Sequence, residues 1–389
     1  MKKFFRGFKK ILAIFVVWRA VQFVIAYVAQ KYLPLNFSYP YIDTALQITN
    51  LPEWIWGWGG FDGVHYLRLA QNGYGDAYTQ AFFPLYPLAV SLFSNIFSRV
   101  GGLDLMRYID PAYFYSGLIL SNIFALFFVF FFYKLLLFDF KKKQALYFIV
   151  LALLFPASYY LGAIYSESLF FLLCVISFYC SRHKNFLLAG FFAMLASATK
   201  VIGVFLFFAL LLEIYQSNKG WKFDKKQILG LLMTPVGLIT YMLYLWKSFL
   251  DPLLFLHVQP GFGAQRSASI FITLPQVFWR YFKMLTTVSL NSPQFFNALI
   301  EVVFALFVIY ILIATYKKAR KSYWLFALLA CVAPTLTGTF SSMPRYALIV
   351  ILLFPYLRDK ILTSRLYLAI SSVLLIIFTM LFLRGYWIA

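Results

Sequence analysis

The stretch that decides the fold is NIFALFFVFFF, residues 122–132, in which every side chain after Asn122 is apolar. A helix of this sequence is apolar on every face, whereas a barrel strand would alternate every second residue. Apolar runs of about 20 residues, the length that crosses a hydrocarbon core as helix, recur along most of the chain. Only 12% of the residues are charged, against about 25% in a soluble domain. The sequence therefore predicts an all-α polytopic membrane protein.

Basic residues are unevenly placed along the chain. Lysine and arginine number 34 against 13 acidic residues, which gives a net charge of +21. Most of them stand in short clusters between apolar runs, a pattern typical of cytoplasmic loops. No cluster is long enough to line a groove for nucleic acid, so we expect no nucleic-acid partner. The clusters are residues 2–10, 141–143, 182–184, 219–226, 317–321 and 358–365.

Placing these clusters in the cytoplasm predicts about eleven transmembrane helices in one integral membrane domain, residues 1–389. We expect a retained first helix at 11–30 and then a large non-cytoplasmic loop at about 31–111 that contains short interfacial helices. The remaining crossings are three hairpins, at 144–181, 186–216 and 323–357, and single helices near 113–138, 228–250, 295–316 and 366–383.

Segment 82–97 is the ambiguous part of this topology. It is rich in apolar residues and has Pro84 and Pro87 near its start. If it crossed the membrane, the clusters at 141–143 and 317–321 would face outward, against the positive-inside bias. We interpret it as an interfacial or re-entrant helix.

The predicted hairpins are short. Residues 186–199 span about 21 Å as helix, less than the hydrocarbon thickness of about 30 Å, so we expect a turn near Lys200. The same argument places turns near 158–168 and 341–346. These turns carry Glu167, Lys200 and Arg345. Ionisable groups at membrane depth are by default functional candidates, so we expect an outward-facing polar cavity.

Single residues taken alone leave alternatives open. Asp62 follows Gly59-Gly60-Phe61, so a tight turn can present its carboxylate, but it also fits a solvated loop acid. Glu167 fits a helix-start acid favoured by the helix dipole as well as a functional acid. Lys200 and Arg345 fit either functional groups of the predicted cavity or ion-pair partners of Glu167 or another acid. Arg19, midway along the first predicted helix, fits a structural partner within the helix bundle better than a substrate ligand.

Metal chemistry has little support in the sequence. Three cysteines lie in apolar segments, and three histidines are widely separated. This spacing does not correspond to a metal site. We therefore expect neither a metal nor another cofactor.

Four blocks together resemble the GPI mannosyltransferase 2 (PIG-V) family. Residues 61–74 (FDGVHYLRLAQNGY) with 81–88 (AFFPLYPL) are similar to its W-D-x-x-H/W-Y…I-A-x-x-G-Y…F-F-P-x-Y-P-L pattern. Residues 156–158 with 165–170 (YSESLF) resemble its P-x-S…Y-S/T-E-S-L-F block. Weaker matches are 198–203 (ATKVIG) to A-T-R-x-N-G and 344–346 to P-R-Y.

Two positions depart from the family pattern. Phe61 stands where the family usually has Trp, a change that we expect to alter packing only. Lys200-Val201-Ile202 replaces an Arg and an Asn, which removes a planar fork of donors and an amide. Because lysine acts as a point charge, a bidentate phosphate contact is not expected there.

The resemblance implies an inverting membrane glycosyltransferase of the GT-C type. Such enzymes transfer a sugar, here mannose, from a polyprenyl- or dolichyl-phosphate carrier to a glycan or glycolipid acceptor on the non-cytoplasmic side. By this resemblance Asp62 is the catalytic base, with Glu167 as the competing base. The further candidates for binding substrate or its phosphate are His65, Tyr66, Glu167, Lys200, Arg266 and Arg345.

Two other function classes remain open at this point. One is a transporter or flippase for a lipid-linked sugar, although the chain shows no repeated sequence. The other is a noncatalytic subunit of a glycan assembly complex. The membrane lipids are a further expected partner, and the short-looped composition rich in lysine and phenylalanine favours the plasma membrane of a prokaryote over the endoplasmic reticulum.

Overall fold

The computed structural model describes residues 7–36, 41–96, 109–268, 270–357 and 365–388. All regular secondary structure in these ranges is helical, as the sequence predicts. The predicted basic clusters at 2–10 and 358–365 lie largely outside them. The helices form two compact units, which are described separately: residues 1–183 with 368–386, and residues 184–367 with 387–389.

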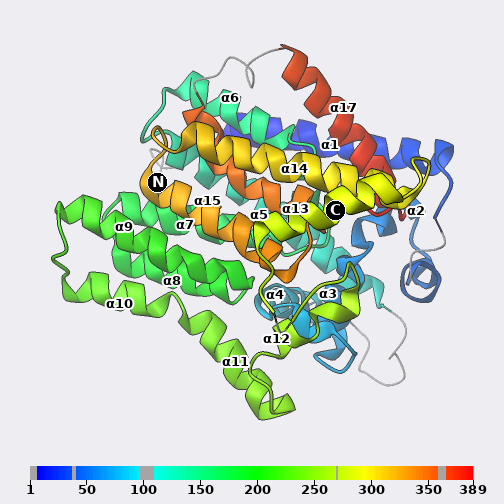
Figure 1. The fold of residues 1–389 in the computed structure, drawn as a ribbon, viewed down its shortest axis with the longest axis horizontal. Helices are drawn as coiled ribbons and strands as arrows, with labels where there is room; N and C mark the ends of the chain where they lie inside the picture. Colours follow the sequence, from blue (N-terminus) through cyan, green and yellow to red (C-terminus); the bar gives the residue numbers. More distant parts are fainter. Residues whose placement is uncertain (1–6, 37–40, 97–108, 269, 358–364, 389) are drawn as a thin grey trace. The chain divides into compact units, whose positions relative to one another are not determined.

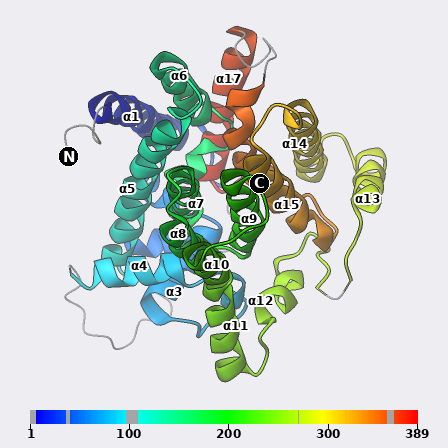
Figure 2. The same cartoon turned by 90° about the vertical axis from the view of Figure 1, so that its left-hand side faces the viewer.

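The first unit is built around two adjacent helices, α5 and α7 (Figures 1 and 2). Phenylalanine rings fill their contact, for example Phe128 against Phe171 with centroids 5.6 Å apart. The α-helices of this unit are α1 (Phe8–Tyr32), α2 (Glu53–Trp56), α3 (Asp62–Asn72), α4 (Leu85–Ser94), α5 (Pro111–Leu136), α6 (Lys142–Leu153), α7 (Glu167–Arg182) and most of α17 (Arg365–Leu383).

In the second unit, α8 lies beside α10 (Figures 1 and 2). Glycine makes this close approach possible, because a Cβ on Gly190 would lie 2.0 Å from the carbonyl oxygen of Gly230. The α-helices here are α8 (Phe186–Ser197), α9 (Leu206–Asn218), α10 (Lys225–Met233), α11 (Val236–Phe249), α12 (Leu254–His257), α13 (Leu274–Thr287), α14 (Pro293–Thr315), α15 (Lys321–Val332) and α16 (Met343–Tyr346).

Shorter helices connect these elements. In the first unit they are the π-helix η1 (Ile42–Leu46) and the 3-10 helices η2 (Gln47–Thr49), η3 (Gly57–Gly59), η4 (Thr79–Ala81) and η5 (Ser158–Leu161). In the second unit they are the 3-10 helices η6 (Val201–Phe205), η7 (Gln259–Phe262), η8 (Ala333–Thr337) and η9 (Ala347–Tyr356).

Six helical segments of the described chain are long and apolar enough to cross a membrane. This property is that of a multi-pass membrane protein, and it agrees with the crossings predicted near 11–30, 113–138, 228–250, 295–316 and 366–383. The segments are Phe8–Tyr32, Pro111–Leu136, Val201–Asn218, Lys225–Phe249, Pro293–Thr315 and Arg365–Leu383. The ambiguous segment 82–97 contains α4, whose ten residues are too short for a full crossing.

Helices break where the sequence predicts hairpin turns. The α8 helix ends at Ser197 and η6 begins at Val201, so the break surrounds Lys200. Segment 154–166 separates α6 from α7, and α15 is followed by η8 and then by a loop that leads into α16. Gly203 lets η6 fold back, because a Cβ there would lie 2.4 Å from the carbonyl carbon of Ala196.

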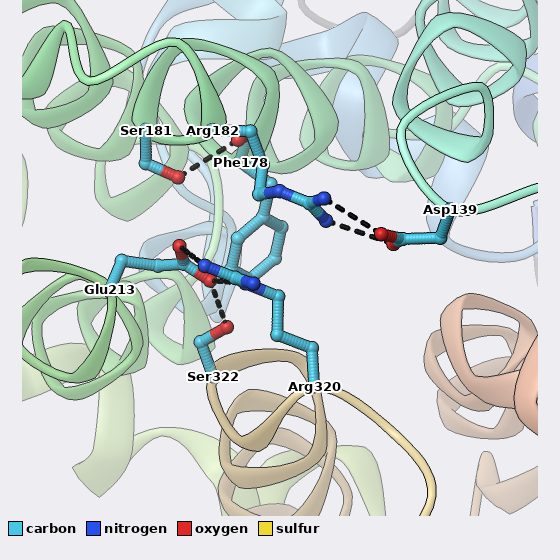
Figure 3. Close-up of polar contacts among 7 residues, drawn as sticks. All are labelled: Asp139, Phe178, Ser181, Arg182, Glu213, Arg320 and Ser322. Atoms are coloured by element: carbon cyan, nitrogen blue, oxygen red, sulfur yellow. Dashed lines mark hydrogen bonds and ion pairs between the residues drawn. The ribbon is translucent and has the colours of Figure 1, made fainter. Parts of the chain in front are cut away.

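One ion pair joins helix ends in each unit (Figure 3); the pair of the first unit is exposed, and that of the second is partly buried. In the first unit, both terminal nitrogens of Arg182 donate to the Asp139 carboxylate, at 2.9 and 2.7 Å. In the second unit, Arg320 donates two hydrogen bonds to Glu213, which also accepts one from Ser322. The pairs join α7 to the end of α5 and α15 to α9.

Candidate active site

Asp62 is the first residue of α3, and the preceding turn is unusual. The 3-10 helix η3 ends in Gly59, Gly60 is extended, and Phe61 has φ 55° and ψ −123°. A positive φ at a bulky residue costs about 1–3 kcal/mol and persists only where the surroundings enforce it. Here the Phe61 ring is buried against Phe382, with centroids 5.5 Å apart. The turn therefore fixes where α3 begins and where Asp62 lies.

Tyr165 ties this turn to the segment that precedes α7. Its hydroxyl donates to the carbonyl of Gly60 at 3.1 Å and accepts from the backbone N–H of Asp62 at 3.2 Å. The N–H of Ile164 donates to the carbonyl of Trp58 at 2.9 Å. The first and second sequence blocks thus form one hydrogen-bonded structure within the first unit.

Tyr66 makes a further bond between the same two blocks. Its hydroxyl lies 2.7 Å from Oγ of Ser166, the residue before Glu167. The Tyr66 ring is buried and meets Tyr86 edge-to-face at 5.2 Å. Through this bond Tyr66 joins α3 to the start of α7, and its predicted contact with substrate stays a prediction.

The two candidate carboxylates both begin helices of the first unit but differ in burial. Glu167 is only 2% exposed, whereas Asp62 is half-buried. Burial raises the pKa of Tyr86, and the charge of Glu167 raises it further. The Tyr86 hydroxyl forms a hydrogen bond with Ser121 Oγ at 2.7 Å. Asp62 is therefore the more exposed of the two candidate carboxylates.

His65 lies one turn after Asp62 on α3, among aromatic rings. It stacks on Phe82 at 5.0 Å and meets Tyr41 edge-to-face at 5.3 Å. Burial lowers the pKa of His65 below its ordinary value; the Asp62 charge opposes this shift, and the Arg68 charge adds to it. Burial thus favours the neutral imidazole, and packing against Phe82 and Tyr41 sets the orientation of its ring.

Arg19 contacts several groups of the first unit, as a structural partner within the helix bundle would. Its guanidinium lies 4.0 Å from the Trp58 ring centroid and 4.3 Å from that of Phe23. It donates to the carbonyl of Gly162 and to Oε1 of Gln22, both at 2.8 Å. Because Trp58 precedes Asp62 and Gly162 precedes Glu167, Arg19 contacts both of the segments that lead to the candidate carboxylates.

The basic candidates lie in the second unit. Lys200 has extended backbone between α8 and η6 and is half-buried. Arg266 donates to Gln259 Oε1 at 3.1 Å and to Ser341 Oγ at 3.5 Å. Arg345, on α16, lies 3.4 Å from Ser342 Oγ. The structure thus brings Arg266 and Arg345 to one short segment, 341–345, and places Lys200 at a different turn.

Sequence reasoning missed a buried acid that braces this segment. Glu301 on α14 accepts a hydrogen bond from the Tyr281 hydroxyl. The Tyr281 oxygen in turn lies 2.9 Å from Thr339 Oγ1 and accepts from the N–H of Phe340 at 3.0 Å. Burial and the Glu301 charge raise the pKa of Tyr281, so the phenol stays protonated. The missed signal was an acid inside a 23-residue apolar helix.

The candidate site residues therefore form two groups. Asp62, His65, Tyr66 and Glu167 are joined in the first unit, and Lys200, Arg266 and Arg345 belong to the second. The described ranges contain no group of three acidic, cysteine or histidine residues placed to hold a metal ion. Tyr165 was quoted in the sequence block but given no role, because a phenol in an apolar run is ordinarily read as packing.

Comparison with known proteins gives one finding. A family profile described as mannosyltransferase (PIG-V) matches residues 8–249, which include both hydrogen-bonded blocks and Lys200. A comparison with curated protein sequences found no significant match.

Proposed function

Because this chain belongs to the mannosyltransferase (PIG-V) family, we propose that it transfers mannose from a polyprenyl-phosphate carrier to a glycan or glycolipid acceptor. The observation that supports this activity best is the Asp62 turn, held by Tyr165 between the two most specific family blocks. We place the reaction on the non-cytoplasmic side, in a GT-C-like protein of about eleven crossings, because the topology predicted from the basic clusters puts the loop of Asp62 on the side opposite to them.

The proposed reaction inverts the anomeric carbon. Asp62 removes the proton of the acceptor hydroxyl while the oxygen of that hydroxyl forms a bond to the anomeric carbon. On the opposite face the bond between carbon and phosphate oxygen breaks, and the electron pair leaves with polyprenyl monophosphate. Pre-positioning of the reacting atoms at about 3–3.5 Å supplies much of the rate. The strained turn at Phe61 and the Tyr165 bridge support such positioning of Asp62.

The leaving phosphate gains negative charge during this step. Fixed cations near it stabilise the transition state. Arg266 and Arg345 are candidates because both contact serines of segment 341–342, and Lys200 is a further candidate from the family block. In this mechanism the residues Tyr281 and Glu301 are positioning residues, since they hold the loop that leads to Arg345.

The test is a mannose-transfer assay on purified protein with Asp62→Asn. Asparagine keeps the size of the side chain but does not take up the proton, and general-base catalysis is worth about 10²–10⁴-fold. We expect a rate loss of at least about 100-fold with donor binding intact. Asp43→Asn is the matched control, because Asp43 is an exposed acid of the same loop.

Three outcomes would redirect the proposal. Full activity of Asp62→Asn together with an inactive Glu167→Gln that still binds donor would move the base to Glu167. Sugar-lipid translocation without transfer in reconstituted vesicles would indicate a flippase. A wild-type protein that neither transfers nor translocates, but supports transfer by other proteins, would indicate a noncatalytic subunit.

A further inference from the structure

The arginines of the first unit that the structure describes differ in what they bond. Arg182 donates to Asp139, and Arg384 donates to Glu53 and to the carbonyl of Leu33. Arg19 donates to Gln22 and Gly162. Each of these three guanidinium groups is committed to a protein acceptor.

Arg68, on α3, is the exception among them. Its guanidinium lies 4.9 Å from the ring centroid of Tyr41. Its Nε is buried and has no hydrogen-bond partner within the described ranges. A ring face stabilises a cation without using its N–H groups. The Tyr41 ring thus holds the Arg68 cation in place, and N–H donors of the guanidinium remain available to another acceptor.

Arg68 stands on the same helix as Asp62, six residues further along. Six residues of α-helix rise about 9 Å. Both charges act on His65, which lies between them in sequence. Asp62, His65 and Arg68 therefore follow an oblique line of i, i+3 positions on α3, in which Arg68 lies about 120° around the helix axis from Asp62.

This spacing fits an inverting displacement. The acceptor oxygen lies about 3 Å from its base and about 3–3.5 Å from the anomeric carbon, and the leaving oxygen is on the far side of that carbon. Base and phosphate-binding cation therefore need more than about 6 Å between them, which the rise of about 9 Å along α3 provides. An arginine suits the far end, because its planar fork binds phosphate oxygens in a bidentate manner.

We propose that Arg68, supported by Tyr41, binds the phosphate of the lipid carrier next to the base Asp62. This inference rests on the proposed function for the identity of the carrier, but it makes a claim about phosphate binding that is measured without transfer. The other candidate phosphate contacts all belong to the second unit, so Arg68 would be the one that the first unit supplies.

The experiment measures binding of polyprenyl monophosphate, the expected product, to purified protein in detergent. Losing a charge-assisted contact of this kind corresponds to about 10–100-fold in affinity. We expect Arg68→Gln to weaken binding by that factor and to raise the donor KM, and Arg68→Lys to lie between Gln and wild type. Asp62→Asn should bind like wild type.

Two further variants separate phosphate binding from general effects. Lys31→Gln removes one exposed positive charge from the same unit and should leave binding unchanged. Tyr41→Leu removes the ring that lies against the Arg68 guanidinium and should weaken binding although Arg68 itself is retained.

The inference fails if the Arg68→Gln variant, shown to be folded by its thermal melting curve, binds polyprenyl monophosphate as tightly as wild type. It also fails if Arg68→Gln and Arg68→Lys lower only kcat and melting temperature, which would make Arg68 structural. The proposed function is tested separately, because the transfer rate of Asp62→Asn is measured independently of phosphate binding by Arg68.

Discussion

At the residue scale, the environment of His65 leads to a pH-dependent stability. Burial lowers its pKa in the folded protein, so the unfolded chain takes up a proton at a higher pH than the folded one does. Stability is therefore complete above the ordinary histidine pKa of about 6.5 and falls as the pH decreases through it. We expect the melting temperature of wild type in detergent to fall between pH 7.5 and 5.5.

His65→Phe is the comparison variant for this prediction. It retains a ring against Phe82 but has no titrating group. The difference in melting temperature between this variant and wild type should change in favour of the variant at pH 5.5. If the melting temperatures of the two proteins changed in parallel across this pH range, burial of His65 would not be the cause of the pH dependence.

The same scale shows which site residues a sequence makes visible. Asp62 and Glu167 stand out because acids are rare in a chain with 12% charged residues. Arg68 and Tyr165 lie in the same quoted blocks, but their roles depend on Tyr41 and Gly60, at distances in sequence that no local pattern specifies. Glu301 was overlooked because its helix was interpreted only as a crossing.

At the element scale, the two ion pairs of Figure 3 predict different costs. Glu213 is 1% exposed and accepts hydrogen bonds from both Arg320 and Ser322. Removing one partner of a buried pair costs about 3–5 kcal/mol. Since the Arg320 side chain is 28% exposed, we expect Glu213→Gln to cost near the lower figure, about 3 kcal/mol, measured as unfolding in detergent.

Asp139→Asn is the matched control for this pair. Asp139 is more exposed, at 29%, although its bond to Arg182 is bidentate. Exposed pairs contribute about 0–1 kcal/mol, so this variant should unfold close to wild type. Equal destabilisation by the two variants would show that burial does not govern these contacts.

Helix breaks were predictable, but helix type was not. The turn around Lys200 follows from a length argument, because 14 apolar residues do not reach across a bilayer. Residues 347–356 instead form the 3-10 helix η9, in which nearly every side chain is buried. An all-apolar segment carries no periodicity from which its winding can be read. A 3-10 helix rises about 2 Å per residue, so η9 is longer than an α-helix of ten residues.

At the scale of the whole molecule, the basic clusters predict which loops face the cytoplasm. Accessible positions for cysteine exist on both sides of the predicted topology. Ala77 and Asn291 are exposed in loops assigned outside, and Lys142 and Lys318 are exposed in clusters assigned inside. Ser322 is unsuitable, because it is buried and bonded to Glu213 and would stay unlabelled on either side.

In sealed cells, we expect a membrane-impermeant thiol reagent to label Ala77→Cys and Asn291→Cys in a background without the native cysteines. Lys142→Cys and Lys318→Cys should react only after the membrane is opened, because their clusters are held in the cytoplasm by the positive-inside bias. Labelling of Lys142→Cys in intact cells, with Ala77→Cys protected, would place α3 and Asp62 in the cytoplasm. A polyprenyl-phosphate donor presented on the outer face would then be out of reach of Asp62, and the proposed sidedness would be wrong.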